Sequence, residues 1–186
     1  SRLVRHKGVH YLIEAYKKLK TDKKLVIAGG SAFTDDYVKE LKQQAHGNKN
    51  IIFTGNIEGG GELWSELYSN AFLFVHPSES EGLPIVVLEA MSFELPVLAS
   101  NIPENMEAAA HGHGFSFENK NVSDLKGKMK YLLEHPELAK KTGRDARGYV
   151  EKNYNWDDIV KNVEDVYKLT LGVKVLSVFT SKKLVA

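Results

Sequence analysis

The sequence predicts a Rossmann-like, doubly wound α/β fold: a parallel sheet covered by helices, followed by a helical C-terminal extension. Up to residue 117, short apolar runs rich in β-branched residues alternate with amphipathic helical segments. This alternation is typical of a parallel sheet with helices on both faces. Beyond residue 117 the strand signals stop, and three helical segments are predicted at 122–134, 136–151 and 156–170. The tail at 171–186 is ambiguous between helix and strand.

Each element follows from a local pattern. The strands are short apolar runs between turn residues, at 24–30, 50–55, 71–77, 95–100 and 113–117. The helices between them are predicted at 7–19, 34–47, 61–70, 83–93 and 103–110. The second of these helices begins with Asp35 and is followed by Gly47, while the fourth has Pro84 in its first turn.

The composition excludes several classes of function. With 186 residues, 42% of them hydrophobic and 26% charged, the chain suits one globular domain. A net charge of +1 gives no general attraction for nucleic acid. The absence of cysteine excludes disulfides and Cys-based zinc or redox chemistry, and it fits a cytoplasmic protein. No apolar run approaches the ~18 residues of a membrane span.

A ligand site is predicted where the strands end. In parallel sheets, ligands bind at the carboxyl ends of the strands, which here carry the loops 29–33, 55–61, 77–83 and 100–104. The loop 77–83 leads into a helix whose first N–H groups have no intrahelical partner and therefore attract anions. Gly82 leaves room for a ligand at this backbone, and Glu81 stands beside it.

Glu89 lies eight residues after Glu81, inside the apolar run "IVVLEAM". A buried carboxylate without partners is destabilising, so a pair of neutral hydroxyls such as a ribose diol would suit it. The alternative, an exposed Glu89 or one paired with a neighbouring cation, remains open. For Glu79, which lies between Ser78 and Ser80, we expect a solvated loop carboxylate.

The first residues form a basic turn. Arg2, Arg5, His6 and Lys7 precede the first helix. Arginine grips phosphate through two N–H groups and lysine through a point charge, so this turn suits a diphosphate. A solvated basic turn is the alternative.

No metal or cofactor motif is found. The chain has no Asp-x-Asp sequence, because Asp35-Asp36 and Asp157-Asp158 are adjacent pairs. We interpret "HGHG" at 111–114 as a loop rather than a metal site. "GGSAF" at 29–33 lacks the dinucleotide and Walker patterns, and the segment His76–Ser78 lacks the hydrolase elbow.

Several motifs together resemble one family. "SRLVRHKG", "LVIAGG", "EGLPIVVLEAM" followed by "LPVLAS", and "GFSF" occur here in the order and spacing seen in retaining GT-B glycosyltransferases of the family-4 (group 1) type. The resemblance covers residues 1–170 and includes an E-x7-E signature at Glu81 and Glu89. One departure is Glu94, which stands where the family usually has the glycine that ends the signature helix.

The resemblance implies a donor site for a nucleotide-diphosphate sugar. It places Arg2 and Lys7 on the diphosphate and Glu81 at the sugar hydroxyls, and these three would be catalytic. The remaining implied contacts are the backbone of Gly82, Leu83, Pro84 and Ile85 for sugar or phosphate oxygens, Glu89 for the ribose, and Asn56 and Ile57 for the base.

The implied reaction is hexosyl transfer with retention of anomeric configuration, without a metal or cofactor. The donor would be linked to UDP, GDP or ADP. A non-catalytic nucleotide-sugar binding module and a GT-B sugar-nucleotide epimerase are the alternatives.

The resemblance is to the C-terminal half of such enzymes only. We expect that an N-terminal acceptor-binding domain is missing and that this chain binds donor without turning it over. We expect a cytoplasmic location, with peripheral association at the inner membrane face through the missing domain as an alternative.

Overall fold

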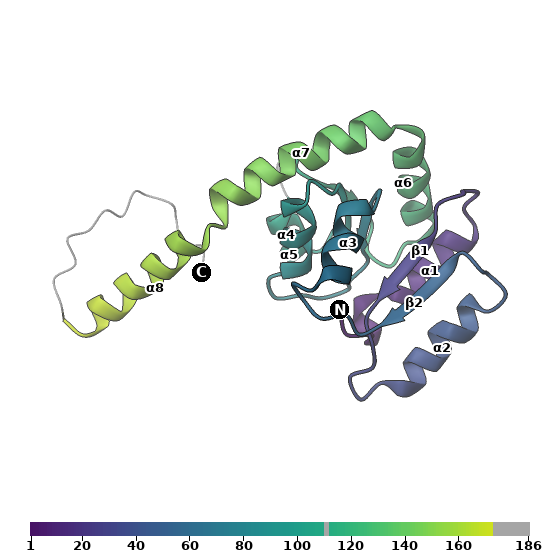
Figure 1. Ribbon diagram of the computed structural model, residues 1–186, viewed down its shortest axis with the longest axis horizontal. Coiled ribbons are helices and arrows are strands. Elements are labelled where there is room, and N and C mark those ends of the chain that lie inside the picture. The colour runs from purple at the N-terminus through teal and green to yellow at the C-terminus, as the bar shows by residue number, and fades with distance from the viewer. Residues whose placement is uncertain (110–111, 173–186) are drawn as a thin grey trace. The chain divides into compact units, whose positions relative to one another are not determined.

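The computed structural model describes residues 1–109 and 112–172 (Figure 1). It divides into two compact units, Ser1–Val150 and a second unit that begins at Glu151. The strands of the first unit are β1 (Leu25–Ala28), β2 (Ile51–Gly55), β3 (Phe74–His76), β4 (Val97–Ser100) and β5 (Phe115–Phe117). Its helical elements are the 3-10 turn η1 (Arg5–Lys7), α1 (Val9–Lys17), α2 (Asp35–Ala45), α3 (Glu62–Asn70), α4 (Ile85–Ser92), α5 (Pro103–Ala108) and α6 (Val122–Glu134). The helix α7 (Pro136–Asn153) begins in this unit.

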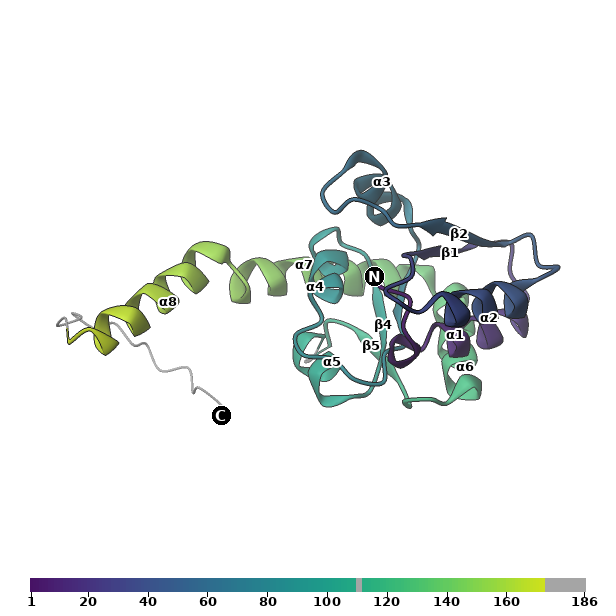
Figure 2. The same ribbon diagram turned by 90° about the horizontal axis from the view of Figure 1, so that it is seen from below.

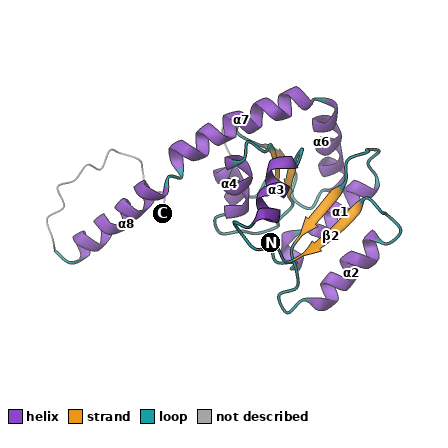
Figure 3. Cartoon of the chain, viewed as in Figure 1, coloured by secondary structure: helices purple, strands orange, loops and turns teal. Residues whose placement is uncertain are grey.

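All strand pairs are parallel, as predicted, but they form two groups rather than one continuous sheet. β1 pairs with β2, and β4 lies between β3 and β5. Within the described residues, β1 and β3 are not paired with each other, and no further strand lies between them to join the two groups. The segment before η1 instead runs along the end of β1, where the Leu3 N–H donates to the Gly30 carbonyl at 2.8 Å. Figure 3 shows the alternation of strands and helices that the periodicity predicted.

The core lies between the strands and the helices α1, α2 and α6. α1 contacts both α2 and α6, and Figure 2 shows the three on the same side of β1 and β2. Their apolar faces meet in a cluster of buried side chains that includes Ile13, Leu41, Leu98, Leu125 and Leu132. This packing fixes the layer from which the loops at the carboxyl ends of the strands project.

Glu94 ends α4 in the conformation that glycine usually supplies. Its φ is +58°. The Glu94 N–H donates to the Met91 carbonyl at 3.0 Å, and the Leu95 N–H donates to the Ala90 carbonyl at 3.1 Å. These two bonds form a Schellman motif with Glu94 at its left-handed position. The structure therefore shows Glu94 strained into the glycine conformation rather than a different helix end.

We expect Glu94→Gly to raise the free energy of unfolding by about 1 kcal/mol, because glycine adopts this φ without a Cβ clash. The ion pair lost with it, Arg147 Nη1 to Glu94 Oε1 at 3.4 Å, is about half exposed and contributes little. Urea denaturation measures the change. Glu94→Ala is the control, because it loses the ion pair and keeps the strain. Equal stability of the two variants would contradict the assignment.

The second unit contains α8 (Trp156–Thr170). Asn155 caps it, with its side-chain oxygen accepting from the Asp157 N–H at 2.8 Å. The helix matches the predicted span 156–170. Residues 173–186, most of the ambiguous tail, lie outside the described residues. Among the residues that the structure describes, no helix is long and apolar enough to cross a membrane.

Candidate active site

The basic turn and the loop after β3 meet backbone to backbone. Gly8, in the left-handed conformation with φ +66°, lies so close to Pro77 that an added Cβ would be 1.9 Å from the Pro77 carbonyl oxygen. Next to this contact, the Glu79 N–H donates to the His6 carbonyl at 2.7 Å. Two segments about seventy residues apart in sequence are therefore locked together at the carboxyl end of β3.

This junction brings Lys7 to Glu81. The ammonium of Lys7 donates to both oxygens of the Glu81 carboxylate, at 2.6 and 2.7 Å. His76, the last residue of β3, places its Nε2 at 2.8 Å from Glu81 Oε1. The side chains of Lys7, Glu81 and His76 are 15%, 8% and 6% exposed. Two of the three predicted catalytic groups thus form a buried ion pair, with a histidine that was not predicted to belong to this site.

The environment holds Glu81 ionised. Burial acts to raise the pKa of its carboxyl, but hydrogen bonds from His76, Lys7 and Ser78 outweigh burial and lower the pKa from its ordinary 4.5 to about 2. A carboxylate that keeps its charge while nearly enclosed can accept hydrogen bonds from hydroxyl groups. It is therefore suited to a polyhydroxylated ligand.

The same shift predicts an acid-sensitive fold. Because the pKa of Glu81 is lower in the folded state, its contribution to stability is full above about pH 4.5 and is lost as the pH falls toward 2. The contribution amounts to about 3 kcal/mol. Urea denaturation between pH 6 and pH 2.5 should show this loss in the wild type and a shallower one in Glu81→Gln. The exposed Glu107→Gln should follow the wild type, and parallel pH profiles for all three proteins would contradict the assignment.

The start of α4 lies beside Glu81. Pro84 is the N-cap residue and has no N–H, and the Ile85 N–H donates to the Leu83 carbonyl at 2.9 Å. Within the described residues, the N–H groups of Gly82 and Leu83 donate to no protein acceptor. Of the four residues predicted to offer backbone donors, Gly82 and Leu83 are therefore the two that can do so, next to the positive end of the helix dipole.

Glu89 lies on α4 and is half-buried. The hydroxyl of Tyr68, on α3, donates to Glu89 Oε2 at 3.2 Å. Burial and the charge of Glu89 raise the pKa of Tyr68 above its ordinary value, so the phenol stays protonated. No other described side chain donates to the Glu89 carboxylate. The neighbour that it pairs with is thus a neutral phenol rather than a cation, and the second carboxylate oxygen has no protein donor.

The remaining predicted residues flank the end of β1. Arg2 is exposed, and the segment that carries it is bonded to Gly30 through Leu3. Asn56 packs against Gly30, where an added Cβ would lie 2.5 Å from Asn56 Oδ1. Asn56 is exposed and Ile57 partly so. These residues are placed on the same edge of the strands as the ion pair.

The expectation of a solvated Glu79 was wrong. Glu79 is not a solvated carboxylate but is 20% exposed and paired. The Tyr11 hydroxyl donates to it at 2.9 Å and the Lys120 ammonium lies at 2.8 Å. The bond from Lys120, opposed by burial and helped by Tyr11, lowers the pKa of Glu79. Its partners come from α1 and from the loop after β5, so nothing near it in sequence indicated them.

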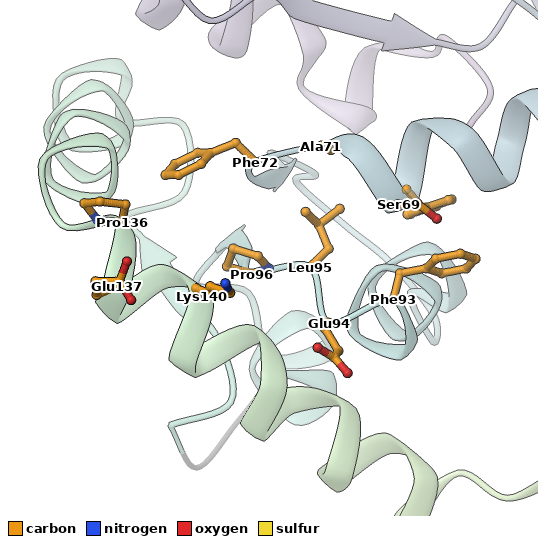
Figure 4. Close-up of a pocket in the computed structure, with 11 residues that line it drawn as sticks. Ser69, Ala71, Phe72, Phe93, Glu94, Leu95, Pro96, Pro136, Glu137 and Lys140 are labelled. Carbon is orange, nitrogen blue, oxygen red and sulfur yellow. The ribbon is translucent and has the colours of Figure 1, made fainter.

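A separate cavity of about 270 Å³ lies at the opposite edge of the strands (Figure 4). It is lined by side chains that precede β3 and β4 and that begin α7, among them Phe72, Pro96, Pro136 and Lys140. None of the predicted site residues lines it. Across residues 1–109 and 112–172, no group of three or more His, Asp or Glu side chains could hold a metal ion. Part of the "HGHG" segment lies outside that range.

Comparison with known proteins gives the family. The model of the family described as Glycosyl transferases group 1 matches residues 1–148. The chain belongs to this family. An uncharacterized glycosyltransferase of Methanocaldococcus jannaschii is 32% identical over 173 residues, which cover 91% of this chain and 44% of that protein. The alpha-maltose-1-phosphate synthase of Mycobacterium tuberculosis is 29% identical, over 90% of this chain and 46% of that protein.

Solved structures share the fold. The C-terminal domain of a group 1 family protein from Francisella tularensis is 27% identical, covers 83% of each chain and has a TM-score of 0.74. HepE from Anabaena, solved with UDP, is 25% identical, with a TM-score of 0.82 over 90% of this chain and 47% of that chain. The fold is thus that of the C-terminal half of a GT-B glycosyltransferase. The relatives are transferases, which does not favour the epimerase or the non-catalytic module.

Proposed function

We propose that the chain binds a nucleoside-diphosphate sugar at the carboxyl ends of its strands. With an acceptor-binding domain, it would transfer the sugar with retention of anomeric configuration and without a metal. The observation that carries this proposal is the buried pair of Lys7 and Glu81 beside the start of α4. A cation for phosphate and a carboxylate for hydroxyls then lie within one site.

The pair explains how one site takes an anion and a sugar. The ammonium of Lys7 has three N–H donors, two of which are used by Glu81. In the proposed complex, Lys7 turns to the diphosphate together with Arg2, and Glu81 then accepts hydrogen bonds from the sugar hydroxyls. The N–H groups of Gly82 and Leu83 bind sugar or phosphate oxygens. The cations of the site therefore contact the phosphates of the ligand, and the carboxylate contacts its hydroxyl groups.

The remaining contacts fix the nucleoside. Glu89 accepts from the ribose diol with the carboxylate oxygen that Tyr68 leaves available. Asn56 and Ile57 lie against the base. HepE, which was solved with UDP, has the same fold, and this supports a nucleotide as part of the ligand.

The chemical step breaks the bond from the anomeric carbon to the diphosphate and forms a bond from that carbon to an acceptor hydroxyl on the same face. The acceptor proton passes to an oxygen of the leaving diphosphate. Negative charge grows on that diphosphate, and the nearby cations and N–H groups stabilise it without a metal. The acceptor is held by another domain, since the chain spans about half the length of the curated relatives it matches.

The role of Glu89 is tested by calorimetric titration with a nucleoside diphosphate and its 2′-deoxy analogue. We expect Glu89→Ala to weaken binding of the ribonucleotide about tenfold, the effect of losing one or two hydrogen bonds to a charged group. The 2′-deoxy analogue should show a smaller difference in affinity between wild type and Glu89→Ala, because one of the two ribose hydroxyls is already missing.

Glu107→Ala, on α5, serves as the control and should bind like the wild type. Equal affinity of wild type and Glu89→Ala for the ribonucleotide would contradict the ribose contact.

A further inference from the structure

Glu81 is held from two directions by groups of different kinds. Lys7 comes from the turn η1 and His76 from the end of β3. The Ser78 hydroxyl is a third group that lowers the pKa of Glu81. A carboxylate with a pKa of about 2 is ionised near neutral pH and can only accept hydrogen bonds. His76 Nε2, at 2.8 Å, must therefore carry a proton and donate it to Oε1.

Donor binding would remove one of these supports, because Lys7 is the cation that the diphosphate attracts. Glu81 is 8% exposed, so water cannot replace the lost ammonium. An ionised carboxylate in such a place needs another hydrogen-bond donor to remain where it is. Within the described residues, His76 is then the side chain that remains bonded to it, since the Ser78 hydroxyl donates to the His6 and Ser80 carbonyls.

His76 is fixed more firmly than Lys7. Its backbone lies in the parallel pair with β4, in register with Ala99. Its ring is 6% exposed and stacked on Phe74, with the centroids 6.1 Å apart and 13° between the planes. A side chain locked in this way can aim a hydrogen bond without moving when the site fills.

We propose that His76 is a positioning residue that holds the Glu81 carboxylate in place at the donor sugar while Lys7 binds the diphosphate. The proposal rests on the proposed function, and it assigns His76 no contact with substrate. A purely structural histidine would also be buried and stacked, but it would have no need to direct Nε2 at the one carboxylate assigned to the sugar.

Two variants separate the positioning role of His76 from a purely structural one. His76→Phe keeps an aromatic ring on Phe74 and removes the donor. His76→Gln keeps an N–H at the position of Nε2 and removes the ring. Both are made in a protein that carries this chain with its acceptor-binding domain, and thermal unfolding measures how much of each protein is folded.

With a nucleotide sugar and acceptor at saturation, we expect His76→Phe to lower kcat about tenfold with little change in KM for the donor, the effect of one hydrogen bond to a charged group. The acidic limb of the pH profile of kcat should move to higher pH, because Glu81 loses a bond that favours its ionised form. His76→Gln should restore most of kcat and the wild-type limb.

The positioning role would be overturned if the acidic limb of His76→Phe did not move, or if both variants lost kcat equally. In either case, turnover by the wild type would leave the proposed function standing. Absence of turnover by the wild type with UDP-, GDP- and ADP-sugars would overturn the proposed function and this inference with it.

Discussion

Glu81→Gln is expected to lower kcat about 100-fold in a protein that carries both the donor and acceptor domains. Glutamine keeps the size of the side chain and can still accept from a sugar hydroxyl, but it removes the charge that Lys7 and His76 hold in place. Loss of one preorganised electrostatic group at a reacting centre typically has an effect of this size. Steady-state turnover at saturating donor and acceptor measures it.

The matched control is Glu89→Gln, which changes the other carboxylate of the E-x7-E signature. Glu89 is assigned to the ribose, far from the bond that breaks, so its loss should raise KM for the donor more than it lowers kcat. A kcat for Glu81→Gln within threefold of the wild type would show that Glu81 does not act at the reacting sugar.

Gly8→Ala should lower the free energy of unfolding by more than about 3 kcal/mol. A residue with a Cβ is strained at φ +66°, and the new Cβ would lie 1.9 Å from the Pro77 carbonyl oxygen, so two backbones must separate. Urea denaturation measures the change. Because Gly8 joins the turn of Lys7 to the loop of Glu81, the variant should also lose affinity for the donor.

Gly47→Ala separates the backbone strain at positive φ from the steric clash of the new Cβ. Gly47 also has a left-handed backbone, with φ +81°, but an added Cβ would meet nothing within 4 Å. It should show only the conformational penalty, about 1 kcal/mol. Equal destabilisation of the two variants would mean that the contact between Gly8 and Pro77 does not restrain the site.

Local patterns predicted the helices and strands because the residues that start and stop each element lie close to its ends. The strand–helix alternation and the glycine after α2 lie within a few residues of the boundaries that they set. The rule that parallel strands end at one edge then placed Glu81 at the ligand edge, and the family resemblance added Lys7 to the same site. Their direct pairing, across 74 residues of sequence, is a tertiary contact that no periodicity reports.

Three side chains show where sequence reasoning stopped. His76 and Tyr68 lie within a predicted strand and a predicted helix, and neither was predicted to bond to a glutamate. A polar ring at the last residue of a buried strand, next to the ligand edge, was the available signal for His76. Glu79 was wrongly expected in solvent because its partners, Tyr11 and Lys120, are distant in sequence.

The central claim, that this chain alone is a donor-binding unit for a nucleotide sugar, is tested most directly by calorimetric titration. The 186-residue chain is titrated with UDP-, GDP- and ADP-sugars in buffer containing EDTA. We predict that at least one of them binds with a Kd below about 1 mM, an affinity of about −4 kcal/mol or better, and that Lys7→Ala weakens this binding at least tenfold. The absence of binding by all three at millimolar concentration would contradict the claim.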